Sequence, residues 1–528
     1  MSIKMTQLAL LLLALSVSIS AYGQIRSSTI SGTVTDSSGA IISSATVTIT
    51  NEMTSVTQSQ VSNSAGQFVF PLLQEGQYSV AVSANGFTPY KQTGIRVAPS
   101  QSVRVDVELV VTSVQSLVEI RASSAQLQTE TTSVSGALNS TAIEAVPNIT
   151  QNPLYYAFLQ AGVQPRNAAN STTSTNSFGI GVNGRRQFSA VGINGGRAFT
   201  NDIQLDGLPV MGGGYNEAAV IPNTEGLQEV RVISNNFSAE YGRGQGVISM
   251  TTKSGANQFH GQGSYMLRNE ALNANTNSNK ANGNRRAPFK VNEFGGTISG
   301  PIIKNKLFFS SSYHHLRFNQ GVVTLTTVPT MLERVGNFSQ TFIRDESGQP
   351  TPAQVFNPFQ VTQIGPNLYR RTPYPNAIVT NPHPAALYIN SFYPEPNRTP
   401  DDVFNTNNFT VTKVQTIRRH SLNNLVDFKW KNHSIYGSGG LGYGEVQTPR
   451  PFGEIPFNGA PSRTRDRNPY VQIGDTIVFS PTLILDVRYG ATRINTPDFA
   501  GDKEGFTEYD RIAIWHLPAS APQIVRRR

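Results

Sequence analysis

The sequence predicts a mainly β protein made of three consecutive parts: a small β-sandwich, a small α/β module, and a series of antiparallel membrane-type strands. Residues 25–110 consist of short alternating runs separated by turn residues, which is typical of a sandwich. Residues 225–261 contain two further alternating runs around a glycine-rich turn. After His260, segments of about ten residues alternate apolar with polar side chains and carry aromatics near their ends, as outer-membrane strands do.

The composition agrees with strand-rich structure and excludes several kinds of chemistry. Only 14% of the 528 residues are charged, against about 25% in ordinary soluble domains. Cysteine is absent, which excludes disulfides, thiolate metal sites and thiol catalysis. The net charge of +9 comes from scattered arginine pairs, whereas a nucleic-acid binder clusters its basic residues on one element. We therefore expect solvated basic loops and no nucleic-acid partner.

Residues 1–23 have the three parts of a cleaved secretory signal. Lys4 gives a basic start, an apolar run extends from Leu8 to Ile19, and Ala21 and Gly23 are small residues at the cleavage site. The apolar run is shorter than the roughly 20 residues that a membrane-spanning helix needs. The sequence predicts cleavage after Gly23 and an exported chain.

Residues 25–110 form the predicted sandwich, with strands expected at 29–35, 45–50, 66–70, 77–82 and 103–109. The runs SGTVTD, AGQFVFPLLQEGQYSVAV and ANGF resemble the carboxypeptidase regulatory-like domain, which has a carbohydrate-binding-like fold. This part contains no histidine, so it offers no zinc carboxypeptidase site. Tyr78, Phe87 and Tyr90 could stack on sugar rings, although we expect them in or around the core.

Residues 111–134 are rich in Ser, Thr and Gln and predict a linker. One apolar patch interrupts it at Leu117, Val118 and Ile120, with Glu119 between them. Two interpretations stay open. The patch is an extended segment that adds to the sheet edge of another protein, or it is the last strand of the sandwich or the first of the next module.

Residues 135–254 form the central module. Short helices are expected at 142–147 and 154–159, followed by a polar loop at 167–182 and a strand leading into a turn at 201–207. In the run at 229–232, valines alternate with Glu229 and Arg231, and the run at 248–251 alternates in the same way. Both runs predict half-buried strands, joined by a tight turn that brings Glu240 close to Arg243.

Residues 258–528 carry the membrane-type pattern. Strand candidates lie at 261–268, 293–303, 306–313, 421–430, 434–443, 471–479 and 483–492. The connection at 329–409, rich in Pro and Asn, is far longer than globular domains usually contain. Outer-membrane barrels favour such connections because their extracellular loops are long.

Four motifs in the central module carry a resemblance to a known family. Leu205-Asp206-Gly207, LQEVRV, SAEYGR and TTKSGANQFHG occur in this order, and NEFGGTISGPIIKNKLFFSSSY follows. Together they resemble the plug and first barrel hairpin of TonB-dependent outer-membrane receptors, particularly the Oar-like group. The resemblance implies that residues 135–254 are a plug and that residues 258–528 are the N-terminal portion of a transmembrane β-barrel.

The resemblance also implies a function and a set of partners. We expect an outer-membrane receptor for uptake of a ligand too large for porins, energised by TonB with ExbB and ExbD. Its surroundings are outer-membrane lipid, and its extracellular ligand is unknown, with a saccharide and a peptide as alternatives. The plug charges Glu229, Arg231, Glu240 and Arg243 are expected to latch the plug in the polar lumen through breakable pairs.

The implied site residues fall into three groups. The TonB-contact candidates are Leu117, Val118, Glu119 and Ile120; the plug-motif residues are Asp206, Gly207, Glu229, Arg231, Glu240, Tyr241, Gly242 and Arg243; and the ligand-facing plug loop contains Asn183, Arg185, Arg186, Asn194 and Arg197.

No enzymatic site is expected. The seven histidines are scattered after residue 259 without metal-ligand spacing, and His314 and His315 point to opposite faces of a strand. Nucleophile-elbow and P-loop motifs are absent from the sequence. We therefore predict no catalytic residue, metal or cofactor. The alternative function is an exported carbohydrate-binding or adhesion protein that acts through its N-terminal sandwich.

The number of barrel strands raises a question about length. Receptors of the implied class close 22 strands around their plug, which takes over ~200 residues in strands alone. Roughly eight strands can be placed after residue 258. The sequence therefore predicts part of a barrel, as expected for a fragment or a frameshifted product.

Overall fold

The computed structural model describes residues 28–98, 101–111, 118–121, 133–146, 148, 152–165, 189–212, 216–236, 241, 244–275, 277–281, 285–452, 461–480, 483–495 and 498–500. The predicted signal peptide and most of the predicted linker lie outside these residues. No helix among the described residues combines the length and the apolar character needed to cross a membrane.

The N-terminal part is a two-sheet sandwich. One sheet has the order β4-β1-β7, with β8 also paired to β1, and the other has the order β3-β2-β5-β6-β9. Its strands are β1 (Ser28–Asp36), β2 (Thr46–Asn51), β3 (Thr57–Val61), β4 (Gln67–Leu73), β5 (Gly76–Ser83), β6 (Tyr90–Val97), β7 (Ser102–Arg104), β8 (Val107–Leu109) and β9 (Val118–Arg121). The predicted strands are confirmed except that the run at 103–109 is divided into β7 and β8, and β3 and β6 were missed because their sequences, TQSQV and YKQTGIRV, are mostly polar.

The alternation of the sandwich strands produces a closed apolar core. Along β1 every second residue is buried, and Ile30 and Val34 are fully covered. Tyr78 and Tyr90 belong to this core, and Phe87 packs against it. Burial raises the pKa of the Tyr78 hydroxyl, which donates a hydrogen bond to the Gln74 carbonyl at 2.9 Å. These rings therefore stabilise the sandwich, and they present no stacking platform for a sugar.

The central module is a five-stranded sheet with the order β10-β15-β16-β13-β14. Its elements, with a separate pair of short strands, are β10 (Val134–Asn139), α2 (Ser140–Ala145), η1 (Pro153–Leu159), β11 (Val163–Pro165), β12 (Val191–Ile193), β13 (Asp202–Leu205), β14 (Leu208–Pro209), β15 (Leu227–Asn235) and β16 (Val247–Thr252). Asn139 and Asn152 cap α2 and η1 by accepting backbone N–H bonds. The two expected short helices are thus confirmed, the second as a 3-10 helix.

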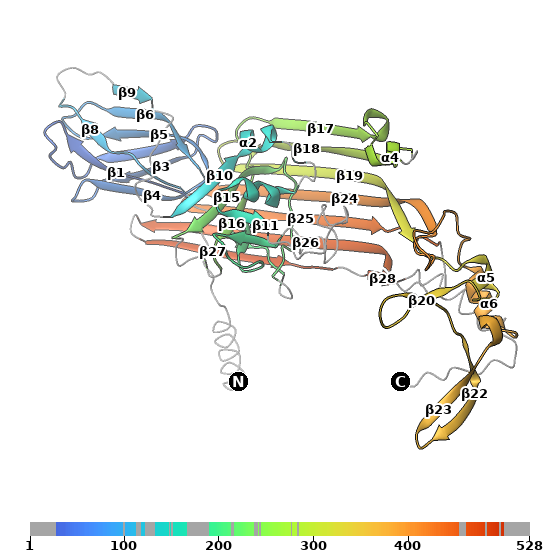
Figure 1. Ribbon diagram of the computed structural model, residues 1–528. Coiled ribbons are helices and arrows are strands. Elements are labelled where there is room, and N and C mark those ends of the chain that lie inside the picture. Colours follow the sequence, from blue (N-terminus) through green and yellow to red (C-terminus); the bar gives the residue numbers. More distant parts are fainter. Residues whose placement is uncertain are drawn as a thin grey trace, which may run out of the picture.

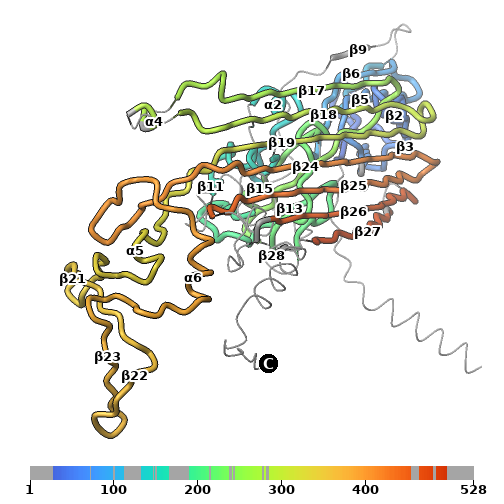
Figure 2. The backbone as a smooth tube through the Cα atoms, turned by 90° about the vertical axis from the view of Figure 1, so that its right-hand side faces the viewer, coloured from blue at the N-terminus to red at the C-terminus, as the bar shows by residue number. Residues whose placement is uncertain are grey.

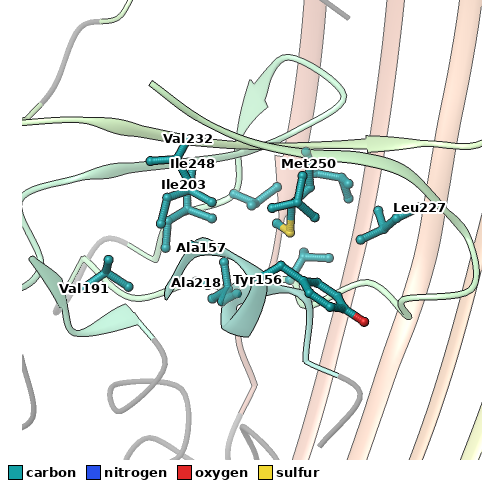
Figure 3. Close-up of a cluster of buried hydrophobic side chains, with 14 of the residues drawn as sticks. Tyr156, Ala157, Val191, Ile203, Ala218, Leu227, Val232, Ile248 and Met250 are labelled. Atoms are coloured by element: carbon teal, nitrogen blue, oxygen red, sulfur yellow. The ribbon is translucent and has the colours of Figure 1, made fainter. Parts of the chain in front are cut away.

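Residues from β13, β15, β16 and η1 build the core of this module (Figure 3). Val230 lies opposite Met250, and Val232 opposite Ile248, so these apolar side chains share one face. The expectation of half-buried strands was wrong, because Glu229 and Arg231 are buried as well. β15 pairs with β10 and β16 on its two edges, and the module lies against the large C-terminal sheet (Figure 1).

The C-terminal part is an eight-stranded antiparallel sheet. Strands β17 to β19 and β24 to β27 follow each other in the order β17-β18-β19-β24-β25-β26-β27, and β28 pairs with β26. Their bounds are β17 (His260–Asn269), β18 (Phe289–Ile303), β19 (Leu307–Thr326), β24 (Phe409–Trp430), β25 (His433–Gln447), β26 (Pro461–Ser480), β27 (Leu483–Thr492) and β28 (Asp498–Ala500). Every predicted strand is present, and most are longer than expected, because pairing continues beyond the alternating core of each run.

The two ends of this sheet differ. At one end the strands are joined by short turns at 304–306 and 431–432, and at the other by connections at 270–288, 327–408 and 448–460. In outer-membrane barrels the short turns are periplasmic and the long connections extracellular. The sandwich lies at the short-turn end and the long connections extend from the opposite end (Figures 1 and 2).

The long connection at 327–408 is folded, which sequence reasoning did not foresee. It contains α5 (Met331–Arg334), β20 (Phe342–Arg344), β21 (Pro350–Pro352), β22 (Phe356–Gly365), β23 (Leu368–Pro373), η4 (Pro375–Ala377) and α6 (Pro384–Ser391). Thr330 and Glu333 form a capping box at α5. Arg334 donates hydrogen bonds to the carbonyls of Tyr393 and Pro394, which ties α5 to the end of α6. Prolines of the connection begin two of its helices, at Pro375 and Pro384.

Candidate functional site

The large sheet has an inverted distribution of side chains. Along β24, Arg419, Ser421 and Asn423 face the central module and are buried, while Leu422 and Val426 are exposed on the other side. The same pattern recurs on β26, where Gln472 is 2% exposed and its neighbours Val471 and Ile473 are 56% and 55% exposed. A polar inner and an apolar outer face are what lipid on one side and a polar lumen on the other require.

The inner face also holds one apolar group nearer the long-connection end. Val291, Leu316, Phe318, Ile417 and Val446 pack together there. Next to this group, on the side of the short turns, the His314 imidazole and the Glu293 carboxylate form a buried pair at 2.6 Å. His315 lies on the outer face against His420. The expectation that the two histidines point to opposite faces is confirmed.

Asp206 and Gly207 form the turn between β13 and β14. Both have positive φ, 51° and 77°, a conformation that glycine and, less readily, aspartate adopt. The fully buried Asp206 carboxylate accepts hydrogen bonds from the Thr252 backbone N–H and hydroxyl, at 2.9 Å and 2.8–2.9 Å. Asp206 therefore ties this turn to the end of β16, which explains the motif as a structural one.

Glu229 and Arg231 form a buried ion pair within the module, with Oε1 and Nε 2.9 Å apart. Burial raises the pKa of the Glu229 carboxyl and outweighs the opposing effects of Arg231 and of Arg96 from the sandwich. The two charges thus pair with each other inside the module, and the expected latch in the lumen stays a prediction. Glu240, Gly242 and Arg243 lie outside the described residues, and Tyr241 among them is an isolated described position.

The end of the module that faces the long connections can be located from strand direction. β13 and β16 run parallel, and β16 ends beside Ser254, whose hydroxyl donates to Asp427 at the short-turn end of β24. The segment before β13 therefore lies toward the long connections. It contains two of the predicted ligand-facing residues, Asn194 and Arg197, and both are exposed. The other three, Asn183, Arg185 and Arg186, lie outside the described residues.

This outer end is held by a close contact between two turns. The Arg197 backbone N–H donates to Gln245 Oε1 at 3.0 Å. Gly244 has a φ of 85°, and a Cβ there would collide with the Thr200 carbonyl. The turn before β16 and the segment before β13 thus support each other, which leaves the Arg197 side chain facing outward.

Side chains of the barrel wall make the hydrogen bonds that hold the module. Arg419 Nη2 donates to the Ile221 carbonyl at 3.0 Å, and Gln472 Nε2 donates to the Leu205 carbonyl at 3.2 Å. The Tyr436 hydroxyl reaches the Asp206 carbonyl at 3.4 Å, and the Tyr470 ring joins the module's core. Sequence reasoning missed these four residues; polar or aromatic side chains at alternate positions of barrel strands were the available signal.

A cavity of about 40 Å³ separates part of the module from the wall. Since a water molecule needs roughly 10–15 Å³ of such space, it has room for a few. Arg419 Nη1 is buried there and has no hydrogen-bond partner among the described residues. The lining consists of Ala219, Val220, Ile221, Arg419, Ser421, Asn423, Gly442, Tyr443, Gly444, Asp466 and Asn468. The contact between module and wall is therefore polar and partly open to water.

The predicted TonB-contact segment occupies a sheet edge of the sandwich. β9 pairs in parallel with β6, placing Val118 opposite Tyr90 and Ile120 opposite Gln92. Leu117 lies just outside the described residues. Of the two interpretations left open by the sequence, this position corresponds to the last strand of the sandwich.

The module lies against the polar inner face of an antiparallel sheet whose outer face is apolar, as the wall of an outer-membrane barrel is. Comparison with known families agrees. The model described as outer membrane beta barrel domain matches residues 251–524, just over half of the chain, and the model described as carboxypeptidase regulatory-like domain matches residues 29–110. The chain belongs to the outer membrane beta barrel domain family.

One curated relative is similar over about half of this chain. The TonB-dependent transporter Oar of Myxococcus xanthus is 26% identical in an alignment of 302 residues, which covers 54% of this chain and 26% of the relative. The aligned part therefore spans about a quarter of that protein's length.

Two solved structures illustrate weaker similarities. The siderophore receptor PirA from Pseudomonas aeruginosa is 12% identical with a TM-score of 0.24, covering 69% of this chain and 59% of that one. Wild-type catechol 1,2-dioxygenase from Acinetobacter radioresistens is 15% identical with a TM-score of 0.14, covering 19% and 58%. TM-scores this low do not establish a shared fold.

Proposed function

We propose that this chain is the plug-bearing part of an outer-membrane receptor that imports its ligand when TonB, energised by ExbB and ExbD, pulls on the segment before the plug. The observation that carries the proposal is the contact between plug and wall. It includes hydrogen bonds from Arg419 and Gln472 to backbone carbonyls, beside a cavity with room for water. Water can replace such hydrogen bonds as the plug moves. An apolar contact between plug and wall would not allow this replacement.

Ligand would arrive from the long-connection end. Asn194 and Arg197 are exposed at the end of the plug that faces the long connections. Their amide and guanidinium groups suit a polar ligand, either a saccharide or a peptide. The buried positions of Tyr78 and Tyr90 do not favour the alternative of a sugar-binding sandwich.

TonB would take hold by strand addition at residues 117–120. In this structure, β9 already pairs with the edge of β6. Engagement by TonB would therefore require β9 to leave that edge, or TonB to pair with its free side. The family resemblance and the TonB-dependent relative support this assignment.

The test uses the detergent-solubilised chain and a purified periplasmic domain of TonB. Binding to the unmodified chain is expected, together with its loss after deletion of residues 117–122. Deletion of residues 123–128, a matched control in the same linker, should leave binding intact. Undiminished binding after the first deletion would refute the assigned segment.

A cellular experiment tests transport itself. Cells producing the receptor are offered fluorescent oligosaccharides and oligopeptides with and without a protonophore. Accumulation of one class, abolished by the protonophore and by deletion of residues 117–122, is the expected result. Accumulation that continues in the presence of the protonophore would contradict energised uptake.

A further inference from the structure

The sandwich contacts the rest of the protein through two of its turns, and one buried carboxylate lies among these contacts. Asp427, on the inner face of β24 near its short-turn end, is 1% exposed. Its Oδ1 accepts a hydrogen bond from Gln74 Nε2 of the sandwich at 2.9 Å. Its Oδ2 accepts one from the hydroxyl of Ser254, on the connection between plug and barrel, at 2.5 Å. Sandwich, plug connection and barrel wall thus meet at one side chain.

A second group of bonds lies beside the first. The backbone N–H of Asn257 donates to the Met53 carbonyl at 3.1 Å, and its side chain donates to the Thr54 carbonyl at 2.7 Å. The same side chain accepts a bond from the backbone N–H of Asn305 at 2.8 Å. Asn257 therefore links the turn between β2 and β3 to the turn between β18 and β19.

The sandwich turns are shaped for this contact. Asn51 Oδ1 accepts the backbone N–H groups of Met53 and Thr54, both at 3.0 Å, which fixes the first turn. The Tyr78 hydroxyl binds the Gln74 carbonyl, which fixes the second. Both turns are thus held by residues of the sandwich itself, so the docking surface exists before docking occurs.

The interface consists of hydrogen bonds and a small gap lined by residues such as Thr54, Gln74 and Lys429. Interfaces of this polar kind are typical of domains that separate and re-dock. Because each Asp427 oxygen has a different partner, loss of either partner leaves a buried carboxylate oxygen with less compensation.

We propose that the sandwich is a reversible latch on the short-turn mouth of the barrel, and that Asp427 couples its docking to the seating of the plug connection. Displacement of Ser254 weakens the docking of the sandwich, and release of the sandwich loosens Ser254. The proposal does not depend on TonB or on the nature of the ligand.

Disulfide capture tests the docked geometry, and the natural absence of cysteine gives it a clean background. Met53→Cys combined with Asn257→Cys should form an intramolecular disulfide in the full chain, seen as a shift on non-reducing gels. Ser38→Cys combined with Asn257→Cys is the matched control, because the turn after β1 lies at the opposite end of the sandwich. Equal cross-linking of both pairs, or of neither, would overturn the docking.

Thiol labelling tests the coupling. A single Thr54→Cys reporter, at a position 7% exposed, should react slowly with a maleimide in the full chain. Gln74→Ala should accelerate labelling about tenfold or more, as expected for losing one charge-assisted bond. Ser254→Ala should also accelerate it, although Ser254 reaches the sandwich only through Asp427 in the bonds described above.

Ser421→Ala is the control for loss of a serine hydroxyl. Ser421 lies on the inner face of β24, like Asp427, but it bonds Asn423 on its own strand. The substitution should leave the labelling rate unchanged. Heat-modifiable migration of every variant verifies that the barrel part is folded. If Ser254→Ala behaves like Ser421→Ala while Gln74→Ala accelerates labelling, the sandwich docks but the coupling through Asp427 is refuted.

Discussion

The sandwich and the large sheet are built from the same kind of alternating strand, yet they bury opposite side chains. In β1 the covered residues include the apolar Ile30 and Val34, and the one buried polar side chain, Ser28, lies at the start of the strand. In β24 the covered residues are largely polar, including Arg419 and Asp427, while Leu422 is exposed. The difference shows that an alternating run specifies two faces of a strand but not which face is inside. The solvent on each side decides that.

The largest expected effect comes from placing a charge in the sandwich core. Val80→Asp buries an unpaired carboxylate at a fully covered position and should cost about 4 kcal/mol or more, enough to unfold the sandwich. The susceptibility of residues 28–111 to limited proteolysis measures this unfolding. Val69→Asp, at a position 41% exposed on β4, is the control and should resist proteolysis. Equal resistance of the two variants would contradict the assigned core.

The next effect compares two valines of nearly equal exposure. Val61 on β3 is 59% exposed and Val471 on β26 is 56% exposed. Val61→Arg faces water and should change stability by less than about 0.5 kcal/mol. Val471→Arg should cost about 2–4 kcal/mol if its side chain faces lipid near the bilayer midplane. The folding yield in lipid vesicles, read from heat-modifiable migration on gels, distinguishes the two variants. Equal yields would show that the outer face of β26 does not face lipid.

A smaller effect tests the turn that the plug motif forms. Asp206→Ala leaves the buried Thr252 N–H without its acceptor and should destabilise the end of β16 by about 1–3 kcal/mol. Hydrogen exchange at the Thr252 amide reports the loss. Asp206→Asn keeps one oxygen as acceptor and should recover part of the protection. Full protection in the alanine variant would show that the bond contributes nothing.

The smallest effects are opposite pH dependences in plug and sandwich. Burial raises the pKa of Glu229 above 4.5, so its contribution to plug stability is complete below that value and is lost as the pH rises through the raised pKa. Hydrogen bonding from Ser38 lowers the pKa of Asp36 below 3.8, so its contribution to the sandwich is present above that value and is lost as the pH falls.

Hydrogen exchange, corrected for intrinsic rates between acidic and neutral pH, follows each region in the same sample. Glu229→Gln should flatten only the plug profile, and Asp36→Asn only the sandwich profile. If acidification weakens plug and sandwich alike in the unmodified chain, the burial assigned to Glu229 is wrong.

Part of the plug was predictable because its signals are local. The Asp206-Gly207 turn and the pairing of the valine runs follow from residue types that restrict the backbone or alternate along it. The roles of Glu229 and Arg231 were not predictable, since their pairing with each other and their burial depend on what covers β15. Arg419, Gln472 and Asp427 were missed for the same reason, as each acts on a segment distant in the chain.

The sequence by itself determined the three-part mainly β order, most strands of the sandwich and of the large sheet, and the family resemblance, because strand periodicity and turn chemistry are local properties. Tertiary structure alone decided that the polar faces turn inward, that β9 joins the sandwich, and that the connection at 327–408 folds. It also decided that the sandwich docks on Asp427. These features depend on contacts between residues far apart in the chain, and local residue patterns do not specify such contacts.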